Sequence, residues 1–443
     1  MRISIVTLGT QGDVQPYVAL GLGLKGAGHE INLVTHDNFK TFITGRGLGF
    51  SALAIDPRAM LEDEQDHLWQ NGVSSTLRSI ANMARVAEPL AKQLVLDCWR
   101  ACKTADVIMC SVTGSLIGYH IAEKLGVPFY PAYLQNVFRT RAYPSMLAPI
   151  MPLGSGYNWL SYNMVDHLVW RFIRPYTNQV RQEILGLAPL SSTFPLDYIW
   201  QQRQPHLLGF SSAVLPKPPE WGDWAHLTGY WFLDQSDGWQ PPADLVDFLE
   251  SGPAPISVGF GSLHIGDPEA ATKLVVEALA RTKQRGILLT GWGGLRQTHL
   301  PDNVFQIEAI PHDWLFPRVA AVIHHGGAGT TAAGLRAGVP NIVIPHFTDQ
   351  PFWGQRVAQL GVGPRPIPRS ALSSARLAAA IQVAVHDPAM RVRAVALGRK
   401  LQAEDGVARA VEIFQHNSAQ PIAIQSRSPR LLTLRRALGT RSR

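Results

Sequence analysis

Residues 324–350, with the sequence HHGGAGTTAAGLRAGVPNIVIPHFTDQ, combine side chains and backbone that suit the binding of an anion. The apolar run 321–323 before them predicts a buried strand, and the three glycines of the turn allow a ligand to approach the backbone closely. A helix is expected to begin near Thr330. The unpaired amides and the positive dipole end of its first turn favour phosphate oxygens, and His324 is a further candidate donor.

Polar side chains follow the next expected strand, residues 341–344. Gly338 and Pro340 end the preceding helix, so the whole stretch is predicted to be one strand–helix–strand step. Asp349 and Gln350 come just after the carboxyl end of the second strand, the edge at which open α/β sheets bind ligands. A carboxylate and an amide there suit the hydroxyls of a sugar. A glycine turn alone is equally compatible with an ordinary turn whose carboxylate caps the next helix, but the combined pattern disfavours that interpretation.

A second candidate carboxylate lies near the start of the chain. The loop GTQGDVQP, residues 9–16, joins a strand expected over 2–8 to a helix expected over 15–25, which puts Asp13 at the carboxyl edge of a sheet. Such a residue acts either as a cap of the helix or as a base in a cleft. Gly21, Gly23 and Gly26 match GxGxxG, but they fall within the helix rather than directly after a strand, so they indicate close helix packing.

The string HHGGAGTTAAGLRAGVP followed by TDQPFWG resembles the donor-site signature of glycosyltransferases with the GT-B fold, which use nucleotide diphosphate sugars. The sterol glucosyltransferase group is the most similar, and antibiotic glycosyltransferases of the vancomycin type are more distantly similar. The resemblance extends from GTQGDVQP to the C-terminal string. It implies an α/β protein of two Rossmann-like domains whose parallel sheets face an interdomain cleft.

The resemblance also implies roles for individual residues. Asp13 matches the proposed catalytic base, although Gln11 stands where similar enzymes commonly have arginine. Asp349 and Gln350 match the residues that bind the hexose. The diphosphate is expected to contact Ser262, His324, Gly326, Gly327, Ala328, Gly329 and Thr330. Trp292 and the backbone around Ile310 resemble the walls of the nucleoside site, and Trp314 is either part of those walls or a core residue.

These residues predict an inverting transfer of a hexose, glucose by resemblance, from a UDP-sugar to a hydroxyl group of an apolar acceptor such as a sterol. No DxD string follows a strand, so no metal is expected, and the leaving diphosphate would be stabilised by helix dipole, amides and His324. No cofactor is expected, since the UDP-sugar is a substrate. A polyketide, glycopeptide or glycolipid acceptor stays open. A nucleotide-sugar epimerase, a catalytically silent lipid-binding protein and a dehydrogenase are less favoured.

The length of 443 residues exceeds that of a typical single domain. We expect an acceptor-binding Rossmann-like domain over 1–213, a linker rich in proline and tryptophan over 214–242, a nucleotide-sugar-binding domain over 243–415 and a basic tail over 416–443. The three cysteines, Cys98, Cys102 and Cys110, are too few and too clustered for a disulfide framework. They indicate a reducing, cytoplasmic location without a structural zinc site.

The charge of +7 is concentrated at the end of the chain, where no acidic residue follows Glu412. Leu431, Leu434 and Leu438 are spaced for one helix face beside several arginines, so weak contact with an anionic membrane and a merely solvated tail are both open. No nucleic-acid partner, signal peptide or membrane-spanning helix is expected; residues 142–165 are uncharged but interrupted by prolines. Peripheral location at the inner face of the membrane is an alternative to a purely cytoplasmic one.

Alternating apolar runs and helical patterns predict parallel sheets in both halves. In the first half, strands are expected over 2–8, 30–35, 48–55, 107–110, 128–134, near Tyr198 and over 206–209, with helices over 15–25, from Asp37, over 73–100 and over 114–125. Residues 136–160 are expected to form a mobile loop and helix region or an ordinary surface connection. In the second half, strands are expected over 256–259, 286–289, 304–307, 321–324 and 341–344, with helices over 268–282, 330–335, 370–385 and 388–403.

Overall fold

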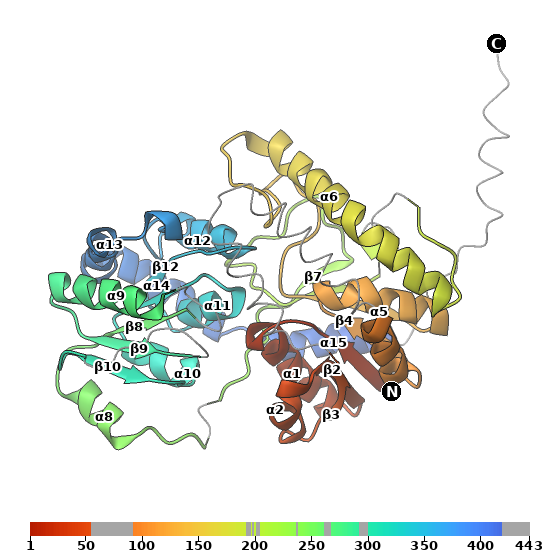
Figure 1. Cartoon of the computed structure of the whole chain (residues 1–443), viewed down its shortest axis with the longest axis horizontal. Helices are drawn as coiled ribbons and strands as arrows, with labels where there is room; N and C mark the ends of the chain where they lie inside the picture. The colour runs from red at the N-terminus through yellow and green to blue at the C-terminus, as the bar shows by residue number, and fades with distance from the viewer. Residues whose placement is uncertain are drawn as a thin grey trace, which may run out of the picture.

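Two parallel β-sheets, each covered by helices, make up the molecule (Figure 1). The computed structural model describes residues 1–54, 92–191, 196, 199–200, 204–235, 238–260, 267–291 and 300–418. In that part of the chain, the first sheet has seven strands in the order β3-β2-β1-β4-β5-β6-β7, and the second has five in the order β10-β9-β8-β11-β12. The α/β class and the two parallel sheets expected from the sequence are confirmed.

The first sheet lies in the N-terminal half. Its strands are β1 (Arg2–Val6), β2 (Glu30–His36), β3 (Gly49–Leu53), β4 (Val107–Cys110), β5 (Phe129–Tyr133), β6 (His206–Leu208) and β7 (Ala225–Leu227). The accompanying helices are α1 (Gln11–Gly26), η1 (Asp37–Phe39), α2 (Lys40–Thr44), α5 (Val112–Leu125) and α6 (Gly154–Glu183). The sequence did not predict β7, which falls within the expected linker. The strand expected near Tyr198 and most of the helix expected over 73–100 lie outside the described residues.

The second sheet lies in the C-terminal half. Its strands are β8 (Ile256–Gly259), β9 (Gly286–Leu289), β10 (Val304–Ile307), β11 (Ala321–His324) and β12 (Asn341–Val343). The helices are α8 (Ala243–Glu250), α9 (Pro268–Thr282), α10 (His312–Leu315), η2 (Phe316–Arg318), α11 (Ala328–Arg336), α12 (Gln350–Gln359), η3 (Arg369–Ala371), α13 (Ser374–His386) and α14 (Pro388–Gln402). The expected strands agree with these bounds to within one residue, because each is a short apolar run between turn residues.

Each sheet has one point at which the chain order reverses. In the first sheet β1 lies between β2 and β4, and Ile3 pairs with both Ile31 and Val107. In the second, β8 lies between β9 and β11. Loops after the central strands of such sheets form the usual ligand crevice. The turn after β1 leads into the first turn of α1, which carries Asp13, and the loop after β11 carries the glycine turn, so the topology puts both at switch points.

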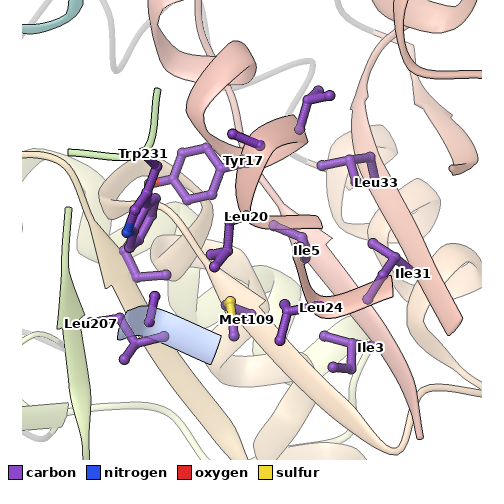
Figure 2. Packing of buried hydrophobic residues seen from close by; sticks show 14 of the residues in the cluster. Ile3, Ile5, Tyr17, Leu20, Leu24, Ile31, Leu33, Met109, Leu207 and Trp231 are labelled. Atoms are coloured by element: carbon purple, nitrogen blue, oxygen red, sulfur yellow. The ribbon is translucent and has the colours of Figure 1, made fainter. Parts of the chain in front are cut away.

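The core of the first sheet explains the position of α1 (Figure 2). Tyr17, Leu20 and Leu24 are spaced by three and four residues, so they share one face of the helix and pack over Ile3 and Ile5 of β1. Burying each of these side chains contributes roughly 1.5–3 kcal/mol relative to exposure. This packing fixes the axis of α1 and hence the position of its first turn.

A last helix, α15 (Gly406–Ser418), returns to the first sheet. Ala410, Ile413 and Phe414 belong to the core around α1, and a Cβ on Gly23 would lie 3.2 Å from Val411. The close helix packing predicted for the glycines of α1 is thus confirmed at Gly23. Sequence patterns predicted neither this helix nor its separation from the domain expected over residues 243–415. The packing therefore makes the C-terminal segment part of the first unit.

An apolar cluster and a polar contact join the two halves. Phe138 and Trp221 from the first half belong to one buried cluster with Phe352 and Trp353 from α12. The hydroxyl of Ser211 donates to Glu404 at 2.6 Å across the same junction. In the described ranges, no helix has the length and apolar character needed to cross a bilayer.

Candidate active site

Asp13 lies in the first turn of α1. The helix begins at Gln11, four residues earlier than expected, so Asp13 belongs to the helix rather than to the loop before it. Its Oδ2 accepts hydrogen bonds from the backbone N–H of Thr10 at 2.9 Å and from the Thr10 hydroxyl at 3.2 Å. The carboxylate thus caps the helix through Oδ2. This cap leaves the other carboxylate oxygen, Oδ1, unused.

The environment of Asp13 makes it a better base than an ordinary aspartate. Burial raises the pKa of its carboxyl group to about 6, the Thr10 backbone N–H lowers it, and the negative charge of Asp349 raises it further. A carboxylate with a pKa close to neutral accepts a proton more readily and still exists largely in its charged form at pH 7. Asp13 therefore has the electrostatic properties of a general base.

The glycine turn after β11 leads directly into α11. Gly326 has φ +93°, and a Cβ there would lie 2.6 Å from Val343 Cγ1 and 3.1 Å from the Gln350 carbonyl oxygen. Only glycine fits both conditions without strain. The helix begins at Ala328, two residues earlier than expected, and Gly327 supplies no side-chain cap. The amides of Ala328, Gly329 and Thr330 therefore form an uncapped helix N-terminus of the kind that binds phosphate.

His324 is held by protein groups on both sides of its ring. Its Nδ1 accepts from the Gly326 backbone N–H at 3.0 Å, so Nε2 carries the proton and donates to Asn341 Oδ1 at 3.0 Å. Burial, followed by nearby His325, lowers the pKa of His324 to about 3. This geometry favours a neutral ring that shapes the glycine turn over the direct phosphate donor expected from the sequence.

His325 is a candidate that the sequence motifs did not indicate. Its Nδ1 is buried and has no hydrogen-bond partner among the described residues. Burial first, and then His346 and His312, lower its pKa to about 3, so the ring is neutral. Its Nε2 lies against Gly327, where an added Cβ would clash with it. Among the described residues, Nδ1 of this neutral ring is thus a buried polar atom that no protein group satisfies.

Asp349 does not cap α12, although it occupies the capping position. Its Oδ1 accepts from the Thr348 hydroxyl at 3.1 Å, and its Oδ2 accepts from the Trp353 indole N–H at 2.9 Å. Thr348 has φ +53°, an uncommon value for a residue with a Cβ. Burial raises the pKa of Asp349. Trp353, one turn along the helix, therefore orients this carboxylate, and sequence spacing of i,i+4 was the available signal for that contact.

Gln350 uses its side-chain carbonyl within the protein. Oε1 accepts from the backbone N–H groups of His346 at 2.8 Å and Phe347 at 3.3 Å, and so it holds the loop after β12. In the described part of the chain, the Nε2 amide of Gln350 has no partner. The amide donors are thus the part of this buried side chain that a sugar hydroxyl would meet.

The N-termini of α1 and α11 approach each other from the two halves. A Cβ added to Gly329 would lie 4.0 Å from the Cα of Gly12. The same approach brings Asp349 close enough for its charge to raise the pKa of Asp13. The structure therefore brings together three of the predicted groups, namely the candidate base, the candidate anion site and the candidate sugar-binding carboxylate.

The other residues expected to bind the donor are Ser262 and those of the nucleoside site. Ser262 and Trp292 lie outside the described residues. Ile310 is 7% exposed and packs in the core beneath α10, so only its backbone can face a nucleoside. Trp314 packs edge-on against Trp239 with ring centroids 5.0 Å apart, which favours the core role for Trp314. The contact also ties the expected linker to the second half of the chain.

Metal-binding groups are not clustered in the described ranges. No set of three or more His, Cys, Asp or Glu side chains there is arranged to hold a metal ion. The charged and polar groups that meet at this site are the helix amides, the two aspartates and neutral imidazoles. Such a set suits a diphosphate and a sugar.

Two family models match the chain. The glycosyltransferase family 28 N-terminal domain matches residues 3–144, and the erythromycin biosynthesis protein CIII-like C-terminal domain matches residues 287–414. The first range contains Asp13, and the second contains the glycine turn and Asp349. Both halves of the candidate site thus fall within the matched ranges.

Three named relatives are similar over nearly the whole chain. Sterol 3-beta-glucosyltransferase UGT80B1 of Arabidopsis thaliana is 37% identical over 94% of this chain and 68% of its own length. UGT80A2 of the same plant is 39% identical over 94% of this chain and 65% of its own length. The sterol 3-beta-glucosyltransferase of Cryptococcus neoformans var. neoformans serotype D is 37% identical over 93% of this chain and 27% of its own length. The chain therefore spans about two thirds of the plant proteins and about a quarter of the fungal one.

Solved structures of glycosyltransferases share the fold. The calicheamicin glycosyltransferase CalG4 is 18% identical and superposes with a TM-score of 0.68 over 95% of this chain and 98% of that chain. The glycosyltransferase SnogD from Streptomyces nogalater is 20% identical, with a TM-score of 0.65 over 94% of this chain and 99% of that chain. The arrangement of two Rossmann-like units is therefore the GT-B fold.

Proposed function

The chain belongs to the family of the sterol 3-beta-glucosyltransferases, and we propose that it transfers glucose from a UDP-sugar to the hydroxyl group of an apolar, sterol-like alcohol. The observation that carries this proposal is the approach of Gly12 and Gly329, which sets the first turn of α1 opposite that of α11. A base on one helix and an anion site on the other match the two ends of a displacement at a sugar carbon.

In the proposed step, Asp13 takes the proton of the acceptor hydroxyl as the acceptor oxygen attacks the anomeric carbon of the sugar. The bond between that carbon and the diphosphate oxygen breaks, and UDP leaves with the electron pair. The raised pKa of Asp13 supports its role as the base. One displacement from the side opposite the leaving group inverts the anomeric centre.

The leaving diphosphate is proposed to bind at the start of α11. The amides of Ala328, Gly329 and Thr330 and the helix dipole would offset its growing charge without a metal ion. Ser262 is proposed as a further contact, and His325 as the imidazole of the pair with a ring nitrogen to offer. His324 is proposed to position the turn through Gly326.

The hexose is proposed to bind Asp349 and the amide of Gln350. Both side chains are preorganised, since Trp353 and Thr348 hold the carboxylate and two backbone amides hold the glutamine carbonyl. Carboxylate and amide groups fixed in this way discriminate between sugars by the positions of their hydroxyls. The nucleoside is proposed to lie against Trp292 and the backbone of Ile310.

The location of the protein is proposed to be cytoplasmic, with peripheral contact at a membrane that holds the acceptor. The basic tail expected over 416–443 is one candidate for such a contact, through attraction of its arginines to anionic headgroups. Residues after Ser418 lie outside the described residues, so the support for the tail comes from its sequence alone.

Product analysis tests the proposal. The full chain is incubated with radiolabelled UDP-glucose as the donor and a sterol as the acceptor. In parallel reactions, TDP-glucose replaces the donor, or an aromatic polyketide alcohol replaces the acceptor. The expected product is a sterol β-glucoside from the α-linked donor, identified by the coupling constant of its anomeric proton. Transfer only to the polyketide would overturn the proposal of a sterol-like acceptor. An α-linked product would overturn the inverting mechanism. Epimerised UDP-sugar without transfer would overturn the proposal as a whole.

A further inference from the structure

Exposed apolar side chains gather on one part of the surface. Of the ten large hydrophobic side chains that are exposed in the described residues, six fall between positions 147 and 164. These are Leu147, Ile150, Met151, Leu153, Leu160 and Met164, and we call them the apolar tip. Scattered exposed hydrophobics are ordinary, but a contiguous group of this kind marks an interaction surface.

The apolar tip is held in place by contacts with the start of α6. The Ser145 backbone N–H donates to the Ser161 hydroxyl at 2.8 Å, the Asn158 amide donates to the Arg141 carbonyl at 2.9 Å, and the Tyr157 hydroxyl donates to the Pro149 carbonyl. These bonds fold residues 141–149 back onto the helix. The apolar side chains therefore face outward from a fixed segment rather than from a loose loop.

The outward face of α6 changes from apolar to cationic along its length. Leu153, Leu160 and Met164 are followed at helical spacing by His167, Arg171 and Arg174, all exposed. The opposite face is buried through Tyr162, Trp170 and Val180. Figure 1 shows α6 lying along the outside of the molecule, beyond both sheets. The exposed stripe is thus free of any covering element in the described chain.

Charge distinguishes the occupants that would fit this stripe. Residues 142–165 carry no charge, and Asp166 is paired with Arg139 at 2.9 Å. Arg171 and Arg174 have no acidic partner in the described part of the chain, whereas Arg181 of the same helix binds Glu123 at 2.7 Å. A second copy of the chain that docked through this face would present an uncharged surface, and so no anionic partner, to these arginines. A lipid surface offers hydrocarbon to the tip and phosphate to the arginines.

We propose that the apolar tip and Arg171 and Arg174 form a docking surface for a lipid bilayer with anionic headgroups. The inner end of the same segment reaches the candidate site, because the Tyr143 ring packs 5.8 Å from Phe352, which adjoins Trp353 and its bond to Asp349. An apolar alcohol would then pass from the bilayer along residues 143–153 to the site. This path, unlike the docking surface, rests on the proposed function.

Vesicle binding by the full-length protein tests the surface independently of catalysis. The Leu153→Glu/Leu160→Glu/Met164→Glu variant should bind phosphatidylcholine–phosphatidylglycerol vesicles at least about tenfold more weakly, because charged side chains resist insertion. Arg171→Gln/Arg174→Gln should lower binding by about tenfold on these vesicles and little on pure phosphatidylcholine, and salt should reduce the difference. The matched control is Val392→Glu on α14, where the replaced side chain is even more exposed, at 67%; it should bind like the parent.

Further variants distinguish the apolar tip from two alternatives, the basic tail and an interface between two copies of the chain. Arg430→Gln/Arg435→Gln/Arg436→Gln in the tail should keep most of the vesicle binding, and unchanged melting temperatures should show that the variants fold. Binding of the triple glutamate variant equal to that of the parent, or a change in its mass from dimer to monomer, would overturn the proposal. Turnover of a detergent-dispersed acceptor should be unchanged in Arg171→Gln/Arg174→Gln, whose side chains lie outside residues 143–153. Absence of all transfer in the parent would refute the proposed function while leaving vesicle binding intact.

Discussion

A Cβ atom on Gly9 would lie 2.6 Å from the carboxyl carbon of Asp13, so the backbone of Gly9 and the Asp13 carboxylate are in direct contact. Gly9 has φ +141°, and its N–H donates to His36 Nε2 at 3.1 Å. The turn before α1 is therefore closed by a residue without a side chain, and the carboxylate lies over that residue. The position of the candidate base depends on this glycine as much as on the helix that carries it.

Gly9→Ala should reduce turnover by about 100-fold or more while the protein still folds. The added methyl group displaces the Asp13 carboxylate, and loss of a positioned base costs about 100-fold to 10,000-fold. Backbone strain should lower the free energy of unfolding by roughly 1–3 kcal/mol. Steady-state kinetics and thermal denaturation measure the two effects separately.

Gly28→Ala is the matched control for that variant. Gly28 follows the same helix and has φ +89°, but nothing lies within 4 Å of a Cβ built there. It should show a comparable loss of stability and normal turnover. Equal losses of turnover in the two variants would mean that backbone strain, and not displacement of Asp13, inactivates the enzyme.

The rate should fall at acid pH with the ionisation of Asp13. With a pKa of about 6, the carboxylate is the major form above pH 6, and kcat/KM should fall about tenfold per pH unit below it. Asp349→Asn removes a negative charge that raises this pKa, so the acid limb of the profile should move to lower pH. An unmoved limb would show that the two aspartates are not electrostatically coupled.

The raised pKa of Asp13 also makes the stability of the protein depend on pH. Because the folded-state pKa of Asp13 is raised above its unfolded value of 3.8, the stability that protonated Asp13 contributes is present below pH 4 and is lost as pH rises through 6. Asp13→Asn should therefore be more stable than the parent at pH 8 and show no such gain at pH 3.5. Urea denaturation at the two pH values measures this, and a gain of equal size at both would point to a cause other than ionisation.

Sequence patterns predicted most strands and the late helices because these depend on local runs of apolar residues. They did not predict α15, whose partner Gly23 lies nearly 400 positions away in the chain and gives no local signal. They also put the start of α1 four residues late, because Pro16 and two glycines looked like loop residues. The actual start is fixed by Thr10 and Asp13, which form a capping pair.

At the site, residue types predicted the groups but not their partners. The glycine turn, Asp13 and Asp349 were found from motif and position at the sheet edge. The bond from His324 to Asn341 joins residues 17 positions apart on neighbouring strands, so only the register of β11 and β12 reveals it. That contact is the basis on which we propose that His324 supports the turn rather than donating to the phosphate.

His324 should remain neutral and keep its proton on Nε2 throughout the working pH range. Its pKa of about 3 and its two protein partners lead to this expectation. Nitrogen chemical shifts of the labelled ring, recorded from pH 8 to pH 5 with and without UDP, provide the measurement. A ring that protonates near pH 6, or whose Nδ1 shift moves strongly on UDP binding, would restore the direct phosphate role.

Turnover should survive removal of divalent cations. The amides of α11 and the neutral ring of His325 are the proposed stabilisers of the leaving group, so treatment with a chelator should change kcat by less than about twofold. Initial rates are measured with and without EDTA, followed by addition of magnesium or manganese. Activity that disappears with EDTA and returns with either cation would contradict the metal-independent mechanism.

Trp353→Phe should impair the use of the sugar more than the binding of UDP. The substitution keeps an aromatic ring beside Phe352 but removes the indole N–H that donates to Asp349 Oδ2 at 2.9 Å. A hydrogen bond to a charged group contributes about 1.5–3 kcal/mol, so kcat/KM for the donor should fall about 10-fold to 100-fold. UDP affinity, measured by calorimetry, should stay within about twofold.

Trp231→Phe is the comparison that isolates this effect. Trp231 is also buried and also donates its indole N–H at 2.9 Å, but to Thr228 in the core of the first sheet. The two substitutions remove the same volume and one hydrogen bond each, so both should lower the melting temperature. Only Trp353→Phe should raise KM for the UDP-sugar, because only Trp353 orients the carboxylate proposed to bind the hexose. Similar kinetic losses in both variants would assign the effect to packing and leave Asp349 without support as a sugar ligand.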